Sequence, residues 1–316
     1  MIVEKSEGQI IDLHKIFKQF LELPNVFDNI ICYLQEEEFL YDEEICRSIL
    51  QAELWKEVKQ KFPNKIVFPL YLFYDDFEPN NPLGSKSGEN LRNFENYMND
   101  SSCLSYGIKE ECIWHELPNF PVTKTVYNDL MHDFLEGILR YDMAEIINCL
   151  IKKKYFSLEQ LNERAGNSIP LIIAEHLKKR CIIMSASEML ALVIYFPILV
   201  GDLVPSTEPV GFLSIVVLYK IFDILLSRTI SKSSISYLKT LIAEHHQLYC
   251  HLFEQTLKPK FHILLHYSRI LKKVGPVCHI WVMRYEAFHK QLKATAKISH
   301  SRVNLLLHRE KNVWYL

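Results

Sequence analysis

Residues 129–150 decide the fold class, and they read DLMHDFLEGILRYDMAEIINCL. Apolar positions in this stretch recur with the three- and four-residue spacing of one helix face. They are Phe134, Ile138, Met143, Ile146, Ile147 and Leu150. The stretch therefore predicts an amphipathic helix, and the chain is predicted to stay helical from Asp129 onward.

Helical patterns also occur before and after this stretch. Ser157-Leu158-Glu159-Gln160 is typical of a capped helix start, because Ser and Gln at this spacing can each satisfy a backbone N–H. Ser185-Ala186-Ser187-Glu188 precedes the apolar run 189–200. Further helices are predicted at 9–61, 211–228, 233–255, 260–273 and 280–298.

One segment has a different pattern. Residues 66–74 are a short apolar run rich in β-branched and aromatic residues, and Asp75 and Asp76 follow directly. This composition predicts a buried strand with a turn after it. Pro69 cannot donate to a sheet ladder, so the strand is expected at an edge or a bulge.

Composition limits the class of protein. The chain has 316 residues, 49% of them hydrophobic, which is enough for a core and for one to three domains. Its eight cysteines form no C-x-x-C pair, and the first residues lack a secretory leader pattern, so a reduced intracellular compartment is expected. Two apolar stretches, 181–204 and 210–226, contain charged residues, which favours buried helices over membrane spans.

Charge is unevenly distributed along the chain. Residues 258–311 contain 12 Lys or Arg and 2 Asp or Glu, a net +10, whereas the remainder has 24 and 36, a net −12. Such segregation suggests a segment that faces a polyanion. The alternative is that the two oppositely charged regions pack on each other.

Three separated motifs each place an acidic residue beside an apolar element: Asp75 after the predicted strand, Asp129 in Asp129-x-x-His132, and Glu286 in the predicted helix 280–298. Carboxylates gathered from distant segments are what a two-Mg²⁺ phosphoryl-transfer site needs. The plainer alternatives are a strand-end turn at Asp75 and a helix N-cap at Asp129, with His132 on the first turn.

The predicted helix 280–298 has a charged face. Glu286, Lys290, Lys293 and Lys297 follow one another at i, i+4, i+7 and i+11. Lysines at this spacing could hold DNA phosphates beside a carboxylate. The alternative is an ordinary amphipathic helix in which Glu286 and Lys290 form a weak surface pair.

Taken together, the motifs resemble those of CACTA-type (EnSpm-like) transposases of animal DNA transposons, which have a ribonuclease H-like catalytic domain with an acidic DDE triad. Asp75-Asp76-Phe77-Glu78 with Asn81-Pro82-Leu83-Gly84-Ser85 is similar to the first-strand motif, and Asp129-x-x-His132 to the D-x-x-H element. Gly275-Pro276-Val277 through Trp281-Val282-Met283-Arg284-Tyr285-Glu286 is similar to the final helix. Segments 20–27, 184–189 and 238–242 also resemble the family.

The resemblance implies roles for particular residues. Asp75 and Glu286 would be the first and third triad acids and the Mg²⁺ ligands, and Asp129 and His132 would complete the catalytic set. The residues expected to bind DNA, weakly and without sequence specificity, are Arg284, Lys290, Lys293, Lys297 and Arg302. Nuclear localisation and self-association are the corresponding expectations, and no membrane partner is expected.

The chain also departs from the family pattern. After Ser87-Gly88 it runs directly into Asn93-Phe94-Glu95-Asn96-Tyr97, so the second triad aspartate and a paired-cysteine element are missing. Lys86 stands where a histidine is often found. Because Mg²⁺ binds poorly to sparse ligand sets, a catalytically defective copy is expected. Asp129 or Asp76 could substitute for the missing acid.

The predicted fold is therefore mostly α: a small incomplete ribonuclease H-like α/β core with a large all-helical insertion. The predicted organisation is a helical segment 1–61, a partial core 62–132, a helical insertion 133–274 and a returning catalytic helix with a short C-terminus at 275–316. Three functions stay open: a transposase-derived protein with little or no activity, a DNA-cleaving enzyme using Asp129 as a substitute acid, and a non-catalytic helical DNA- or protein-binding module.

Overall fold

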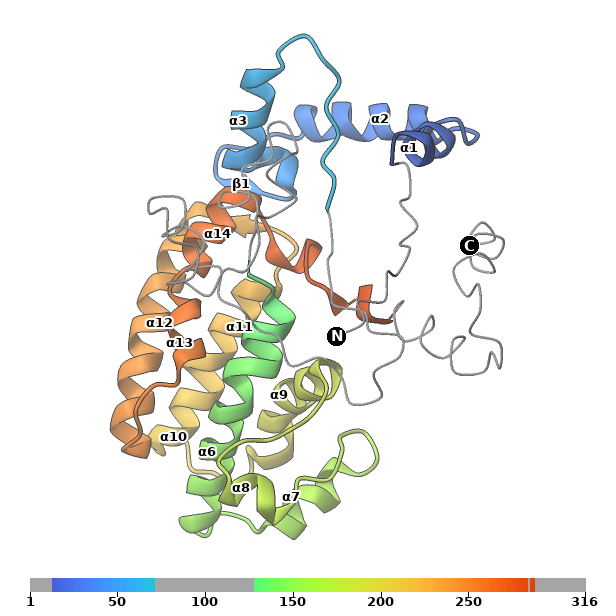
Figure 1. The fold of residues 1–316 in the computed structure, drawn as a ribbon. Helices are drawn as coiled ribbons and strands as arrows, with labels where there is room; N and C mark the ends of the chain where they lie inside the picture. Colours follow the sequence, from blue (N-terminus) through green and yellow to red (C-terminus); the bar gives the residue numbers. More distant parts are fainter. Residues whose placement is uncertain (1–12, 72–127, 284, 288–316) are drawn as a thin grey trace, which may run out of the picture.

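The computed structural model describes residues 13–71, 128–283 and 285–287. This part of the chain is mostly helical, which confirms the predicted class (Figure 1). The predicted division at residues 62–132 falls largely outside the described residues.

The N-terminal part consists of short helices and one very short strand. In chain order these are α1 (Leu13–Leu21), α2 (Val26–Phe39), β1 (Ile45–Cys46), the 3-10 turn η1 (Ile49–Gln51) and α3 (Glu53–Lys61). No residue of α2 is buried, whereas Trp55 of α3 is. The helix α3 packs on α14 (Tyr267–Val274) and so joins this part to the larger body.

The larger body is a bundle of helices. It begins with η4 (Met131–Ile138), α6 (Leu139–Lys152), α7 (Leu158–Ala165), α8 (Ala174–Lys178) and α9 (Ala186–Val200). It continues with α10 (Pro209–Phe212), η5 (Leu213–Leu218), α11 (Tyr219–Leu226), β2 (Ile230–Ser231), α12 (Lys232–Phe253), α13 (Pro259–Leu264), α14 and η6 (Val277–His279).

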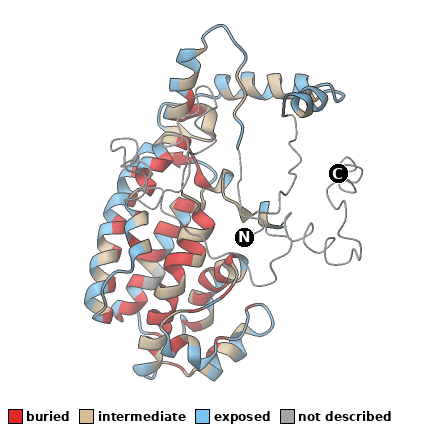
Figure 2. Ribbon diagram, viewed as in Figure 1, coloured by how far each residue is buried: buried red, intermediate tan, exposed pale blue. Residues whose placement is uncertain are grey.

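The core of the body forms where the helices face one another (Figures 1 and 2). The long helix α12 packs against η5, α11 and α14, and η4 packs against α9 and α13. Buried residues gather on these facing sides, while the outer faces are exposed. Phe134, Leu135, Ile138 and Leu139 are completely buried, so the stretch that predicted the helix also supplies the centre of the core.

Helix starts agree closely with the sequence pattern. Ser157 and Gln160 form a reciprocal capping box at α7, and Ser185 and Glu188 form another at α9. Each box satisfies two backbone N–H groups that a helix start leaves unpaired. Both helices therefore begin where the sequence predicted.

The internal geometry of two helical segments was not predicted. Both η4 and η5 are π-helices, in which each N–H bonds five residues back. In addition, the single helix predicted at 260–273 is two helices, because the chain makes a turn at Leu265 and His266. Apolar spacing sets which face is buried, but it does not distinguish these variations.

The predicted strand is wrong over the residues that the structure describes. Residues 66–71 are irregular, and 72–74 lie outside the described part. Pro69 has no N–H to donate, which disfavours pairing at this position. The sheet in the described residues is instead β1 with β2, antiparallel, with Ile45 opposite Ser231 and Cys46 opposite Ile230.

Gly275 lies where the two parts of the molecule meet. Its φ is +77°, and a Cβ placed on it would lie 3.0 Å from the carbonyl oxygen of Ser48 and 3.1 Å from Sγ of Cys46. A side chain here is therefore opposed both by the backbone conformation and by the close approach of the N-terminal part.

We expect Gly275→Ala to lower the free energy of unfolding by about 1–3 kcal/mol, because it adds left-handed strain to a steric conflict with fixed backbone. Urea denaturation followed by circular dichroism measures the change. Gly166→Ala is the matched control, since Gly166 also has a positive φ of +56° but has no neighbouring atom within 4 Å of an added Cβ. If both variants lose the same free energy of unfolding, the close approach of Ser48 to residue 275 contributes nothing to the destabilisation.

One continuous helical stretch, Pro209–Leu226, is long and apolar enough to cross a membrane by length and composition. Half of that 18-residue window is buried inside the protein.

A pair of buried polar side chains lies inside the bundle between α6 and α12. Nε2 of His245 lies 2.9 Å from Oδ2 of Asp142, and the two side chains are 0% and 1% exposed. The His245 ring also stacks on Phe261, with 18° between the planes. Burial and the neighbouring His245 lower the pKa of His246 to about 4, so His246 is neutral at pH 7.

Candidate functional site

Asp129 caps the start of the helix that carries His132. Its Oδ2 accepts a hydrogen bond from the backbone N–H of His132 at 3.0 Å and lies 2.7 Å from Nδ1 of the same residue. Its Oδ1 accepts a hydrogen bond from the backbone N–H of Val282 at 3.0 Å. The N-cap alternative considered for Asp129 therefore describes its geometry, and the same carboxylate also binds a distant segment.

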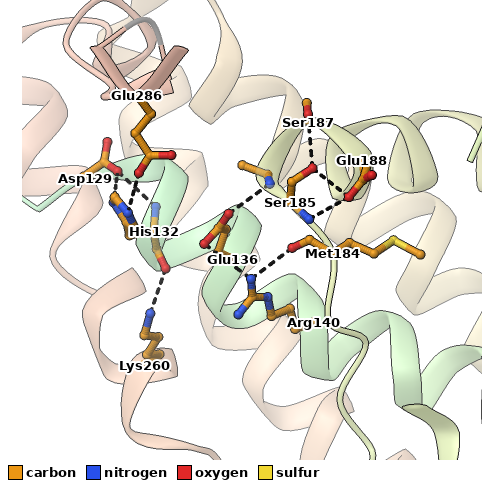
Figure 3. A network of polar contacts seen from close by, with 11 residues as sticks. Asp129, His132, Glu136, Arg140, Met184, Ser185, Ser187, Glu188, Lys260 and Glu286 are labelled. Atoms are coloured by element: carbon orange, nitrogen blue, oxygen red, sulfur yellow. Dashed lines mark hydrogen bonds and ion pairs between the residues drawn. The ribbon is translucent and has the colours of Figure 1, made fainter. Parts of the chain in front are cut away.

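Glu286 completes a chain of three side chains (Figure 3). Its Oε1 lies 3.0 Å from Nε2 of His132. The imidazole thus lies between two carboxylates, with Asp129 on one nitrogen and Glu286 on the other. The structure brings together Asp129, His132 and Glu286, which the sequence had selected from segments far apart in the chain.

The two carboxylates favour a charged imidazole. The hydrogen bond that His132 donates to Asp129 raises the pKa of His132 above its ordinary value, and the charges of Asp129, Glu286 and Glu136 add to this increase. Partial burial opposes it. An imidazolium in this position offsets part of the negative charge of both carboxylates, and neither ring nitrogen is then available to accept a proton.

The π-helix η4 gives this site its backbone geometry. The side chain of Lys260, on α13, donates a hydrogen bond to the carbonyl oxygen of His132 at 2.8 Å. A Cβ added to Gly137 would lie 2.9 Å from the same oxygen and 2.8 Å from Cδ of Lys260. The absence of a side chain at Gly137 therefore allows Lys260 to reach the turn that carries His132.

A second carboxylate, that of Asp133, lies on the same turn. Burial raises its pKa, while Lys260 and hydrogen bonds from Asn128 and Tyr267 oppose the increase. The hydroxyl of Tyr267 donates to Oδ2 of Asp133 over 3.3 Å. None of these contacts was predicted from the sequence, in which the only signal was the position of Lys260 in the basic segment 258–311.

A polar network connects the site with the start of α9 (Figure 3). Glu136 accepts a hydrogen bond from the backbone N–H of Ala186 at 3.0 Å and lies 3.3 Å from Arg140. Arg140 in turn donates to the carbonyl oxygen of Met184 at 2.9 Å. The segment 184–189 is thereby fixed against the helix that carries His132.

The remaining predicted site residues are not among those described. Asp75 lies outside the described residues, and so do Arg284, Lys290, Lys293, Lys297 and Arg302. Residues 283 and 285–287 are helical, whereas residues 280–282 are not, so the predicted start of this helix at residue 280 is wrong.

The described part of the site does not fit Mg²⁺ binding. Both oxygens of Asp129 accept hydrogen bonds from protein donors, and Glu286 faces an imidazole that its neighbours favour in the charged form. Mg²⁺ requires several oxygen ligands in near-octahedral geometry. Within the described ranges, no group of three or more His, Cys, Asp or Glu side chains could hold a metal ion.

We expect the contact between His132 and Glu286 to weaken with rising pH. The pKa of His132 is higher in the folded chain than in the unfolded chain. The contact therefore contributes fully to stability below the unfolded-state pKa of about 6.5, and this contribution is lost as the pH rises through the folded-state pKa. The His132 side chain is 45% exposed, so we expect a contribution below about 1 kcal/mol.

Amide hydrogen exchange of residues 282–287 between pH 6 and 9 measures this loss. In Glu286→Gln the pH dependence should become shallower. Glu175→Gln is the control, because it removes an exposed pair with Lys179 that contains no histidine. A pH dependence that is identical in wild type and Glu286→Gln would exclude the contact as its origin.

Comparison of the chain with models of protein families, with curated proteins and with solved structures gives no match.

Proposed function

We propose that this chain is a transposase-derived protein related to the DDE-type DNA strand transferases, and that this copy is catalytically defective. One observation supports the relationship most directly. The D-x-x-H element, Asp129 and His132, contacts Glu286, the residue that the resemblance identifies as the third acid. A site inherited from such an enzyme requires this convergence of distant segments.

The proposal includes a small, incomplete ribonuclease H-like core. In it Asp75 approaches Glu286, as the first and last acids of one metal site. An experimental structure with these two carboxylates more than about 12 Å apart would contradict the inherited site, because two-metal sites are only about 4 Å wide.

Two features support the loss of catalysis. The sequence lacks the second triad aspartate, and the proposed substitute, Asp129, uses both carboxylate oxygens as acceptors for protein hydrogen bonds. To act as a metal ligand, Asp129 would have to give up the helix cap and the contact with Val282. Phosphoryl transfer by two metals depends on positioning and on charge neutralisation, so a missing carboxylate removes both.

We expect the purified chain to show no Mg²⁺- or Mn²⁺-dependent nicking of supercoiled plasmid DNA. Wild type and Asp75→Ala should give the same background, and Asp75→Asn serves as the matched variant of similar shape. Metal-dependent nicking that disappears in Asp75→Ala would contradict the loss of catalysis. Its disappearance in Asp129→Asn as well would identify Asp129 as the replacement acid.

A non-catalytic helical DNA- or protein-binding module is the second candidate, and the net +10 charge of residues 258–311 favours DNA as its partner. On either proposal the protein works in the nucleus, and self-association is open to direct measurement by sedimentation.

A further inference from the structure

Two histidines lie side by side where α13 ends and α14 begins. Nε2 of His262 is 3.2 Å from Nε2 of His266, and the ring centroids are 4.9 Å apart with 80° between the planes. The pair lies at the protein surface, and its residues are one helical turn apart. This pair has no part in the function proposed above.

The backbone that carries the pair is held by the core. Phe261 and Leu264, on either side of His262, are completely buried, and so is Tyr267, which follows His266. Because these neighbours fix the two backbone positions, the imidazoles have only their own side-chain torsions left to adjust. A ligand that needs both rings together therefore meets a largely preorganised pair.

The separation of the two nitrogens matches a metal chelate. Zn–N bonds of about 2.0–2.1 Å at a tetrahedral angle place two imidazole nitrogens about 3.3 Å apart. We propose that His262 and His266 form a bidentate surface site for a borderline divalent transition-metal ion such as Zn²⁺, Cu²⁺ or Ni²⁺. Two imidazoles four residues apart are known to hold such an ion when they share a helix face, and here the turn between α13 and α14 brings the two rings together in a comparable way.

The choice of ion follows from the ligands. Neutral imidazole suits Zn²⁺, Cu²⁺ and Ni²⁺, whereas Mg²⁺ prefers oxygen ligands. The described residues contain no group of three or more His, Cys, Asp or Glu side chains placed to hold a metal, so the pair supplies the protein ligands and water completes the coordination. A bound ion would tie the end of α13 to the start of α14.

The competing explanation is a simple hydrogen bond from one imidazole to the other. At 3.2 Å the two nitrogens are also within hydrogen-bond distance, with one ring as donor and the other as acceptor. Metal binding and this hydrogen bond differ in a measurable way, because a metal requires both Nε2 atoms to lose their protons and to bind the same ion.

The first experiment uses the reduced full-length chain and ZnCl₂, followed by long-range proton–nitrogen NMR spectra of the histidine rings. We expect one equivalent of Zn²⁺ to shift the Nε2 signals of His262 and His266 together, and lowering the pH to reverse the shift. If neither signal moves, or if only one moves, the proposal is wrong. This measurement needs no variant, so a folding defect cannot obscure it.

The second experiment compares affinities by calorimetry with Zn²⁺ and by absorption with Co²⁺. His262→Gln and His266→Gln should each weaken the site by at least about tenfold, because one remaining imidazole is no longer a chelate. His251→Gln, at another exposed position, should leave the affinity unchanged. Unchanged affinity in the first two variants, or a thiolate-to-cobalt charge-transfer band that persists in them, would assign binding to the cysteines and overturn the proposal.

Discussion

Replacing Asp142 by alanine is expected to lower the free energy of unfolding by about 1–3 kcal/mol, since it leaves a buried polar partner without its counterpart. His245 is completely buried, and its Nδ1 has no hydrogen-bond partner among the described residues. Loss of Asp142 would remove the contact at Nε2 as well. Urea denaturation followed by circular dichroism measures the change, provided that the transition stays two-state.

Two further variants test the cause. Asp202→Ala removes the carboxylate of an exposed pair with Arg164, and we expect a loss below about 1 kcal/mol. The double variant Asp142→Leu/His245→Phe replaces both polar partners, and it should recover most of the stability that Asp142→Ala loses, because buried pairs replaced by apolar residues often cost little. A loss below about 1 kcal/mol in Asp142→Ala itself would show that the buried pair contributes no net stability.

DNA binding is expected to fall by about 150-fold when salt rises from 50 to 200 mM, if Lys290, Lys293, Lys297 and Arg302 each neutralise one phosphate. Four contacts give a slope near −3.6 in log affinity against log salt, because each contact releases condensed counterions. Fluorescence anisotropy with a labelled duplex measures this slope. The net −12 charge on the remainder of the chain should keep the affinity low at any salt concentration.

The position of the contacts can be tested separately. Changing Lys290, Lys293 and Lys297 to glutamine should leave a slope near −0.9. The matched control changes three exposed lysines of the helical body, Lys178, Lys179 and Lys239, and should keep the original slope. Equal effects of the two triple variants would mean that binding depends on total charge and not on the segment 258–311.

Local chemistry made some features predictable from the sequence. The capping boxes at Ser157 and Ser185 and the helix start at Asp129 follow from side-chain groups that pair with backbone only a few residues away. The buried face of 134–150 follows from its apolar spacing. For these elements the deciding interactions lie within one or two helical turns.

Other features depend on partners that are distant in the sequence. The pairing of β1 with β2 joins Cys46 to Ile230, which is 184 positions later in the sequence, and two-residue strands leave no recognisable pattern. Lys260 reaches His132 only because Gly137 leaves room. The apolar run 66–74 favoured a strand, but a strand also needs a partner, and residues 66–71 pair with none in the described structure. The residue types of the site were predictable from the sequence, whereas the contacts that raise the pKa of His132 were not.

The π-helix η4 affects which insertions and deletions the protein can tolerate. A π-helix turns less per residue than an α-helix, so a segment shortened by one residue can cover nearly the same rotation in α geometry. Deleting one residue from 131–138 would therefore leave the segments on either side in nearly the same relative orientation. The same deletion in α6 would turn the flanking segments by about 100° relative to each other, so the fold should tolerate the loss of a residue in η4 better than in α6.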